Sequence, residues 1–162
     1  MLFDELNATR IHSDVVSHVA MNSNGGETAC GLMFFNLVRD FGITAHNVGL
    51  VDSAAVTMFL AANYRVASPL ASFLIHPPTR IFHKDSKHSR SDLIEITEGM
   101  KIEVQQTVQI IVDRTNLTRS RANAMMGKGT VFDAKTAKNA GIVHEISEYQ
   151  PDPGGSIKFI ES

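Results

Sequence analysis

The apolar run VGLVDSAAVTMFLAAN, residues 48–63, limits the possible folds of this chain more than any other stretch. Its first residues complete a predicted strand at 43–51, and residues 53–62 form a predicted helix that is apolar on every side. Because a helix without a polar face is stable only when it is buried, this helix is expected inside the domain. The run therefore predicts a strand that leads directly into an interior helix.

The rest of the chain alternates short apolar runs with helical stretches, which is the pattern of βα units in a mostly parallel sheet. We predict further strands at 18–23, 64–68, 72–76 and 142–146, and further helices at 27–41, 93–114, 118–126 and 134–140. The polar segment 80–92 has no periodicity and is predicted to be an exposed loop. In the helix at 27–41, three- and four-residue spacing predicts a buried stripe of Cys30, Met33, Phe34, Leu37, Val38 and Phe41.

The 162 residues are predicted to form one domain, residues 1–148, followed by a linker and an extended tail at 149–162. A formal charge of −2 gives no reason to expect a nucleic acid or an anionic membrane as partner. We find no apolar run long enough to span a bilayer and no secretory signal peptide. The single cysteine excludes an intramolecular disulfide and is compatible with a reducing compartment, so we expect a cytoplasmic location.

Ser53 is the one hydroxyl at the start of the interior helix, and two interpretations of it stay open. A serine at this position is commonly an N-cap, which contributes about 1 kcal/mol, and Asp52 would cap equally well. It would also project from the carboxyl edge of the sheet, where open α/β sheets place their sites. There the N–H of Ala54 would lie at the positive end of the helix dipole, in a position suited to an oxyanion.

Two other stretches carry possible chemistry. The loop NSNGGE, residues 22–27, contains two glycines, which either form a tight turn or turn backbone N–H groups toward a ligand. His76 closes the strand at 72–76 just before two prolines, and it meets Ser53 only if their strands are neighbours. We expect no cofactor and no metal, since the remaining histidines, including His83 and His88, match no zinc template.

These segments together resemble the proteolytic subunit of the ATP-dependent Clp protease and its shorter bacterial and phage relatives. The resemblance rests on NSNGG, ACGLMFFNLV, GLVDSAAVTMFLAANYRVASPLASFLIHPP and TVFDAKTAKNAGIVHEI, in this order and at agreeing intervals. A more distant similarity extends to the wider Clp/crotonase superfamily. The resemblance implies repeated β-β-α units, with a mostly parallel sheet flanked by helices and a long handle helix at 93–114.

Carried over to this sequence, the resemblance implies that Ser53 is the nucleophile and His76 the general base. The backbone N–H groups of Gly26 and Ala54 match the oxyanion hole. The family's catalytic aspartate corresponds to Gly129, and the next acid is Asp133, which we expect to cap the helix at 134–140 and keep only as a weak candidate for the acid. Without an acid, His76 lacks the group that sets its tautomer and stabilises its charged form.

The resemblance also implies a homo-oligomeric ring that acts on peptides or unfolded polypeptides. The residues before His18 are too few for the strand and helix that usually precede this point, so we do not expect a partnership with an ATP-driven unfoldase. Three hypotheses follow: a serine endopeptidase of the Clp type, a catalytically degenerate relative kept for assembly or binding, and a crotonase-type acyl-CoA enzyme. The Ser-His pair at family spacing favours the first over the third.

Overall fold

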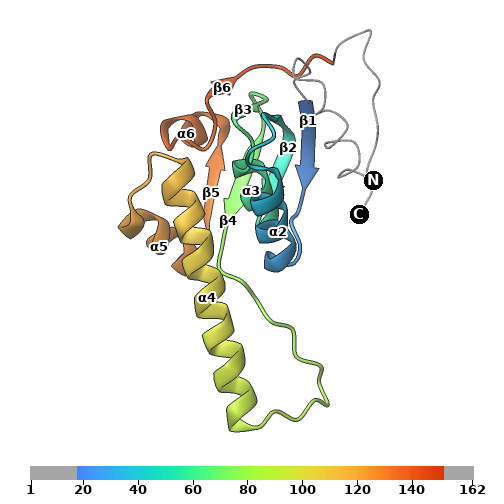
Figure 1. Ribbon diagram of the computed structural model, residues 1–162, viewed down its shortest axis with the longest axis vertical. Coiled ribbons are helices and arrows are strands. Elements are labelled where there is room, and N and C mark those ends of the chain that lie inside the picture. The colour runs from blue at the N-terminus through green and yellow to red at the C-terminus, as the bar shows by residue number, and fades with distance from the viewer. Residues whose placement is uncertain (1–17, 152–162) are drawn as a thin grey trace.

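The structure, a computed structural model, describes residues 18–151 and confirms the predicted α/β class (Figure 1). Six strands form one sheet in the order β5-β4-β2-β3-β6, and β1 pairs with β2 outside this path. The strands are β1 His18–Ser23, β2 Thr44–Asp52, β3 Tyr64–Ala67, β4 Ser72–Ile75, β5 Thr130–Asp133 and β6 Glu145–Ile146. All pairings are parallel except the antiparallel pairing of β4 with β5.

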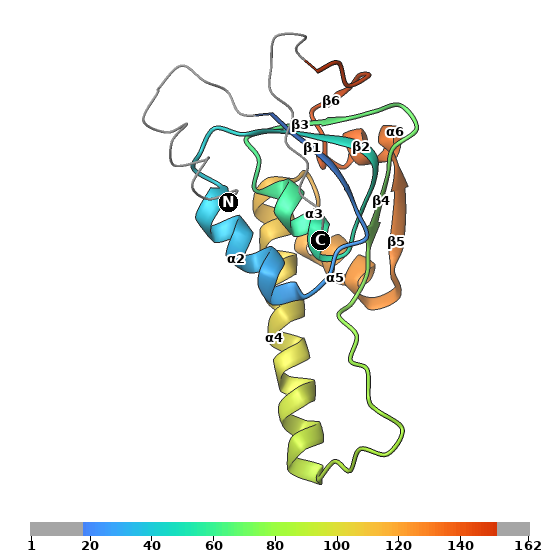
Figure 2. The ribbon, with the colours of Figure 1, turned by 90° about the vertical axis from the view of Figure 1, so that its right-hand side faces the viewer.

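The helices are α2 Thr28–Val38, α3 Ala54–Leu60, α4 Arg90–Arg114, α5 Arg119–Lys128 and α6 Ala134–Asn139. The first half of α4 projects away from the sheet, with the loop before it running alongside (Figure 2). This helix begins at Arg90, three residues before the predicted start, because Ser89 and Asp92 form a capping box there. Among residues 18–151, no helix is long and apolar enough to cross a membrane.

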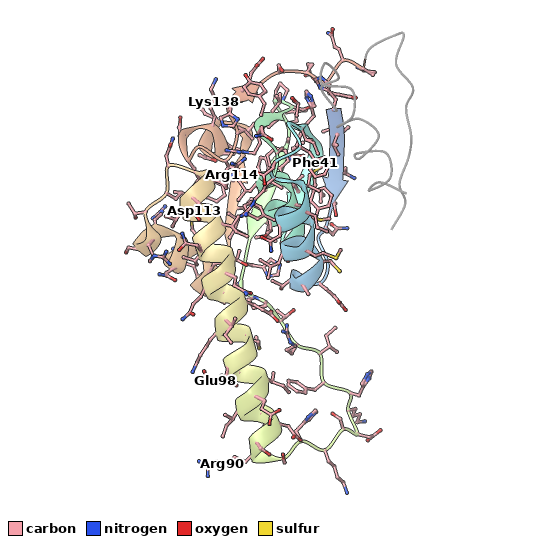
Figure 3. The ribbon with its side chains drawn as sticks, viewed as in Figure 1. Phe41, Arg90, Glu98, Asp113, Arg114 and Lys138 are labelled. Carbon is pink, nitrogen blue, oxygen red and sulfur yellow. The ribbon has the colours of Figure 1, made fainter. Side chains whose placement is uncertain are left out.

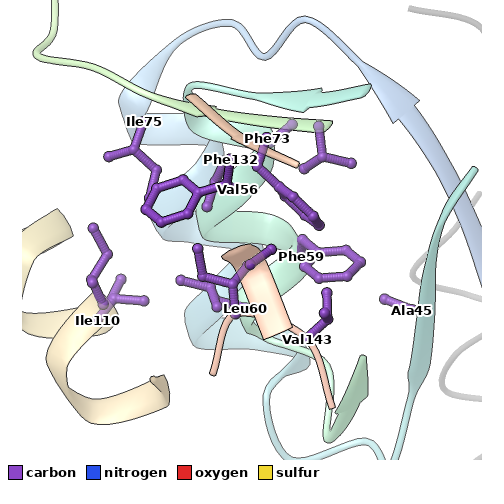
Figure 4. Close-up of a cluster of buried hydrophobic side chains, with 14 of the residues drawn as sticks. Ala45, Val56, Phe59, Leu60, Phe73, Ile75, Ile110, Phe132 and Val143 are labelled. Atoms are coloured by element: carbon purple, nitrogen blue, oxygen red, sulfur yellow. The ribbon is translucent and has the colours of Figure 1, made fainter. Parts of the chain in front are cut away.

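Helix α3 lies in the interior, as its sequence predicts. Val56, Phe59 and Leu60 are buried in a cluster that also contains Phe73 of β4 and Phe132 of β5 (Figure 4). The rings of Phe59 and Phe73 pack with their centroids 5.3 Å apart. Burying each such side chain stabilises the fold by about 1.5–3 kcal/mol, so the core holds the start of α3 in place.

The predicted buried stripe of α2 is wrong in part. Cys30, Met33 and Leu37 are exposed, and the face that packs inward carries Gly31, Phe35 and Val38. A Cβ at Gly31 would lie 2.8 Å from the carbonyl oxygen of Ala54, so this glycine lets α2 approach α3 closely. Apolar residues surround most of this helix, and close packing at Gly31 decided which face is buried.

Two further differences from the sequence-based expectations concern strands. Residues 130–133, which were not expected to form a strand, make β5 and extend the sheet beside β4. The last strand is shorter than expected and consists of Glu145–Ile146 only. The division at residue 148 stays a prediction, and most of the predicted tail at 149–162, from residue 152 onward, lies outside the described residues.

The buried guanidinium of Arg65 joins the C-terminal ends of three helices, α3, α4 and α6. Arg65 is 3% exposed and donates hydrogen bonds to the carbonyl oxygens of Ala62, Arg114, Gly141 and Ile142. Burial, and then the nearby charge of Arg114, lower the pKa of Arg65 to about 10. Figure 3 shows Arg114 in the body, at the opposite end of α4 from Arg90 at the tip. Carbonyl groups at helix C-termini carry partial negative charge, which explains why a guanidinium is tolerated there.

Candidate active site

Ser53 occupies the turn between β2 and α3 in a conformation that is rare for a residue with a side chain. Its φ of 58° and ψ of −127° make it the one non-glycine residue with positive φ among residues 18–151. Such a conformation costs of the order of 1–3 kcal/mol and persists only where the surrounding structure enforces it. The N–H of Ser53 donates to the carbonyl oxygen of Leu74 on β4 at 2.8 Å, which ties the turn to the neighbouring strand.

The capping interpretation of Ser53 is not supported by its side chain. Ser53 is the N-cap residue of α3 by position, but its hydroxyl makes no capping hydrogen bond. No other hydrogen bond involves this hydroxyl within the described chain. Its Oγ is therefore free for a ligand or a base.

The glycine loop, residues 24–27, lies directly against this turn. Gly25 has a φ of 93°, and a Cβ there would lie 2.5 Å from the carbonyl oxygen of Asp52 and 2.7 Å from Cβ of Ser53. The N–H of Gly25 donates to Oγ of Ser23 at 3.2 Å, whereas the N–H of Gly26 has no hydrogen-bond partner within residues 18–151. Of the two loop glycines, Gly26 thus has the N–H that remains available, and its place in an oxyanion hole stays a prediction.

His76 follows β4 directly, and β4 pairs in parallel with β2. In this register Asp52 lies opposite Leu74, so Ser53 and His76 are placed at the carboxyl ends of adjacent strands. The sequence could not show this neighbourhood, on which any cooperation between the two residues depends. Nδ1 of His76 donates a hydrogen bond to the carbonyl oxygen of Pro77 at 2.8 Å, which leaves Nε2 as the acceptor nitrogen.

Ser53 and His76 line one pocket, together with Ala54 at the start of α3. Within the described residues no hydrogen bond joins Ser53 to His76. In unliganded sites such a bond is often long, and it tightens when substrate binds. The remaining lining comes from α2, α3, β4, α4, α5 and the loop after His76, namely Thr28, Val56, Thr57, Ile75, Pro78, Thr107, Ile111 and Met126.

Sequence reasoning missed the pocket residues on α4 and α5. Thr107, Ile111 and Met126 are far from Ser53 in the chain, and the sequence around them indicates only that they belong to helices. No local motif identifies them, because their place in the pocket depends on how the helices pack.

Position 129 is next to His76. Ile75 pairs with Thr130 across the β4–β5 ladder, and a Cβ at Gly129 would lie 3.7 Å from Cβ of His76. Gly129 has no side chain and a φ of 74°. A side chain at this position would therefore contact the candidate base, but the residue present offers it no carboxylate.

Asp133 lies elsewhere, at the other end of β5, where it pairs with Ser72. Its carboxylate caps α6 by accepting hydrogen bonds from the backbone N–H of Thr136 at 2.7 Å and from the Thr136 hydroxyl. These bonds, the hydroxyl first, lower the pKa of Asp133. Asp133 makes no hydrogen bond with His76 within residues 18–151, and its observed role is the cap.

Elsewhere in the described part of the chain, the acids and histidines do not gather into a group of three or more able to hold a metal ion. His83 and His88 lie in the exposed loop. Of the histidines among residues 18–151, His76 is the one that lines the pocket.

Comparisons with known proteins agree with this arrangement. Residues 6–150 match the Clp protease family. Proteolytic subunit 2 of the ATP-dependent Clp protease of Borreliella burgdorferi is 30% identical over 134 residues, covering 80% of this chain and 66% of that protein. The Clp proteolytic subunit of Chlorella vulgaris is 24% identical over 135 residues, covering 80% and 65% respectively. The chain thus spans about two thirds of the length of these relatives.

The fold is also similar to that of a solved structure. A point mutant of ClpP1 from Listeria monocytogenes superimposes with a TM-score of 0.72, covering 92% of this chain and 85% of that one. The two sequences are 21% identical, so this similarity concerns the fold alone.

Proposed function

Because this chain belongs to the Clp protease family, we propose that it is a serine endopeptidase in which Ser53 is the nucleophile and His76 the general base. The observation that carries the proposal is the pairing of β2 with β4, which puts both residues on one pocket. The free hydroxyl of Ser53 and the acceptor Nε2 of His76 provide the two groups that nucleophilic catalysis requires.

The reaction follows from these groups. Oγ of Ser53 attacks the peptide carbonyl carbon while Nε2 of His76 takes the hydroxyl proton. The carbonyl oxygen becomes an oxyanion that accepts hydrogen bonds from the N–H groups of Gly26 and Ala54. His76 then gives its proton to the leaving amine, and an acyl-enzyme forms on Ser53. Water attacks this ester, with His76 first removing its proton and then returning one to Ser53.

We infer that turnover is slow because, in the described part of the chain, no carboxylate bonds to His76. The Pro77 carbonyl accepts a hydrogen bond from Nδ1–H of His76. This bond selects the tautomer whose Nε2 carries no proton, which is the one that a base needs. A neutral carbonyl stabilises the imidazolium less than a carboxylate does. In a well-studied triad, replacing the aspartate by its amide lowers turnover by about 10⁴.

We further propose that the chain acts as a homo-oligomeric ring on peptides or unfolded polypeptides in the cytoplasm. Exposed apolar side chains on the protruding half of α4 and the loop beside it, Ile81, Leu93, Ile94 and Ile102, support an interface there. Native mass spectrometry tests the assembly, and a monomer at all concentrations would contradict it. A requirement for an ATP-driven unfoldase is not part of the proposal.

The decisive experiment is labelling with a fluorophosphonate probe, followed by peptide mapping. We expect adduct formation at Ser53, and its complete loss in Ser53→Ala together with loss of peptide hydrolysis. Ser120→Ala is the matched control, because Ser120 is exposed on α5 and makes no side-chain hydrogen bond within the described residues. Absence of labelling at Ser53 in folded, assembled protein would refute the peptidase.

One observation favours a second function, that of a degenerate relative kept for assembly or binding. Gly129 offers His76 no carboxylate, and no other acid bonds to His76 among residues 18–151. This alternative predicts unlabelled Ser53, intact oligomers, and peptide binding that Ser53→Ala leaves unchanged. A crotonase-type acyl-CoA enzyme has no such observation in its favour, because Ser53 and His76 together line the pocket.

A further inference from the structure

We propose that Asn22 and Asn47 are positioning residues for the oxyanion hole, because their side chains hold a bulge that sets the glycine loop against Ser53. The inference rests on the proposed function and deepens it. Neither residue lines the pocket, so each would act through the loop and not by contact with substrate.

The bulge is visible in the register of β1 and β2. From His18 to Met21 the strands pair residue for residue, with Met21 opposite Asn47. The next pair is Ser23 with Val51. Ser23 is two residues after Met21 on β1, whereas Val51 is four residues after Asn47 on β2. Three residues of β2 therefore face the single residue Asn22, and the regular ladder of hydrogen bonds is interrupted there.

The two asparagine side chains replace the missing ladder bonds. Oδ1 of Asn22 accepts the N–H of Leu50 at 3.0 Å, and Oδ1 of Asn47 accepts the N–H of Gly49 at 3.0 Å. Nδ2 of Asn47, which is fully buried, donates to the carbonyl oxygen of Ser72 at 2.7 Å. The bulge is thus tied to β1 on one side and to β4, the strand that carries His76, on the other.

Gly49 makes this arrangement possible. A Cβ at Gly49 would lie 2.4 Å from Oδ1 of Asn22, so a side chain at position 49 and the present position of Asn22 exclude each other. The contact identifies Asn22 and Gly49 as one unit.

The consequence of the bulge appears at the catalytic serine. By advancing the register, the bulge brings Ser23 level with Val51, and the loop that follows then meets the end of β2. There Gly25 packs against Asp52 and Ser53, and Oγ of Ser23 holds the N–H of Gly25. The next N–H, that of Gly26, makes no hydrogen bond within residues 18–151 and so stays available beside this turn. A displacement of about 1 Å at such a donor costs roughly 10²-fold in rate.

The test uses Asn22, because it is exposed and its replacement leaves the core intact, whereas replacing buried Asn47 risks unfolding. For Asn22→Ala we expect kcat for a peptide substrate to fall by about tenfold or more with KM little changed. The inhibition constant of a peptide aldehyde, whose hemiacetal oxygen occupies the oxyanion hole, should rise by a similar factor. Asn22→Asp retains the acceptor oxygen and should restore most of kcat at physiological ionic strength, where its charge is screened.

Asn63→Ala is the matched control, since Asn63 is exposed and its side chain has no hydrogen bond within residues 18–151. Gly49→Ala should lower kcat as Asn22→Ala does, and the double variant should lose no more than either single one, because both break the same contact. Additive losses would overturn the assignment of the two residues to one unit.

The outcomes separate this inference from the proposed function. If the wild type hydrolyses peptides and labels at Ser53 while Asn22→Ala matches it, the positioning role is refuted and the peptidase stands. A fall in Tm of Asn22→Ala that accounts for the lost activity would make Asn22 a stability residue and would also refute the role. A wild type that neither turns over nor labels refutes the peptidase, and the positioning role with it.

Discussion

The two halves of the candidate site differ in how completely they are built. Around Ser53, a strained turn, a buried helix and a closely packed glycine loop determine each backbone position. Around His76, the neighbouring position 129 is a glycine, and within residues 18–151 the imidazole bonds only to the carbonyl of Pro77. The Ser53 half is therefore fixed by packing and backbone conformation, while in the other half no carboxylate bonds to His76 within residues 18–151.

This difference shows that the two halves depend on different physical terms. The Ser53 half is made by packing and backbone conformation, which the core enforces wherever the fold persists. The His76 half would depend on an acidic side chain at position 129. Such a side chain can be absent without disturbing the sheet, because a Cβ there would make only an ordinary contact with His76. A chain can therefore retain the architecture of a peptidase and still be slow.

We expect the largest effect from a substitution that disturbs the Ser53 half of the site. In Gly25→Ala, the new Cβ would clash with the Asp52 carbonyl and with Ser53, at a backbone φ that disfavours side chains. We expect kcat/KM for a peptide ester to fall by about 10²-fold or more. Gly99→Ala on α4 is the control, because nothing lies within 4 Å of its added Cβ. Wild-type activity in Gly25→Ala would contradict the close contact between loop and nucleophile.

We expect the next largest effect from a substitution that supplies an acid in the His76 half. Gly129→Asp would put a carboxylate beside His76, and we expect kcat to rise by about tenfold or more, with the triad value of 10⁴ as the ceiling. The positive φ at position 129 disfavours any side chain, so some stability should be lost.

Two further variants separate the effect of a charge beside His76 from the effects of side-chain shape and of an added charge elsewhere. Gly129→Asn has the same shape without the charge, and Gly127→Asp adds an acid where nothing lies within 4 Å. A gain in all three variants would exclude an electrostatic cause. No gain in Gly129→Asp, with the fold intact, would mean that His76 does not limit turnover.

The smallest effect concerns Asp133, whose cap lies outside both halves. Asp133→Ala should leave kcat unchanged and lower Tm by a few degrees, because the N-cap of α6 is lost. Asp85→Ala, in the exposed loop and without a hydrogen-bond partner in the described chain, should change neither. A large loss of kcat in Asp133→Ala would restore Asp133 as the catalytic acid.

The contribution of Asp133 should depend on pH with a definite sign. Hydrogen bonds from Thr136 lower the folded-state pKa of Asp133 below its ordinary value. The unfolded state therefore takes up the proton first as the pH falls, and the stabilisation, full at neutral pH, is lost on acidification. The Tm difference between wild type and Asp133→Ala should shrink between about pH 5 and pH 2. A constant difference would contradict the charged cap.

Much of the fold could be predicted because local patterns are strong. The all-apolar run after Ser53 indicated an interior helix, and the alternation of runs indicated a mostly parallel sheet; both are confirmed. The buried face of α2 was predicted wrongly, since that helix has apolar residues on several sides and Gly31 selected one of them. Strand β5 was missed because four residues carry little periodicity and depend on β4 for pairing.

By itself, the sequence determined the order of most elements, since this depends on residue identity and local spacing, and its resemblance to the Clp protease family supplied the candidate residues Ser53, His76, Gly26 and Ala54 and the position of the absent acid, Gly129. Only the tertiary structure decided that β2 and β4 are neighbours, that Ser53 has positive φ, and that a bulge at Asn22 sets the glycine loop. Strand order, register and backbone strain arise from contacts between residues distant in the chain, and a single sequence does not record them.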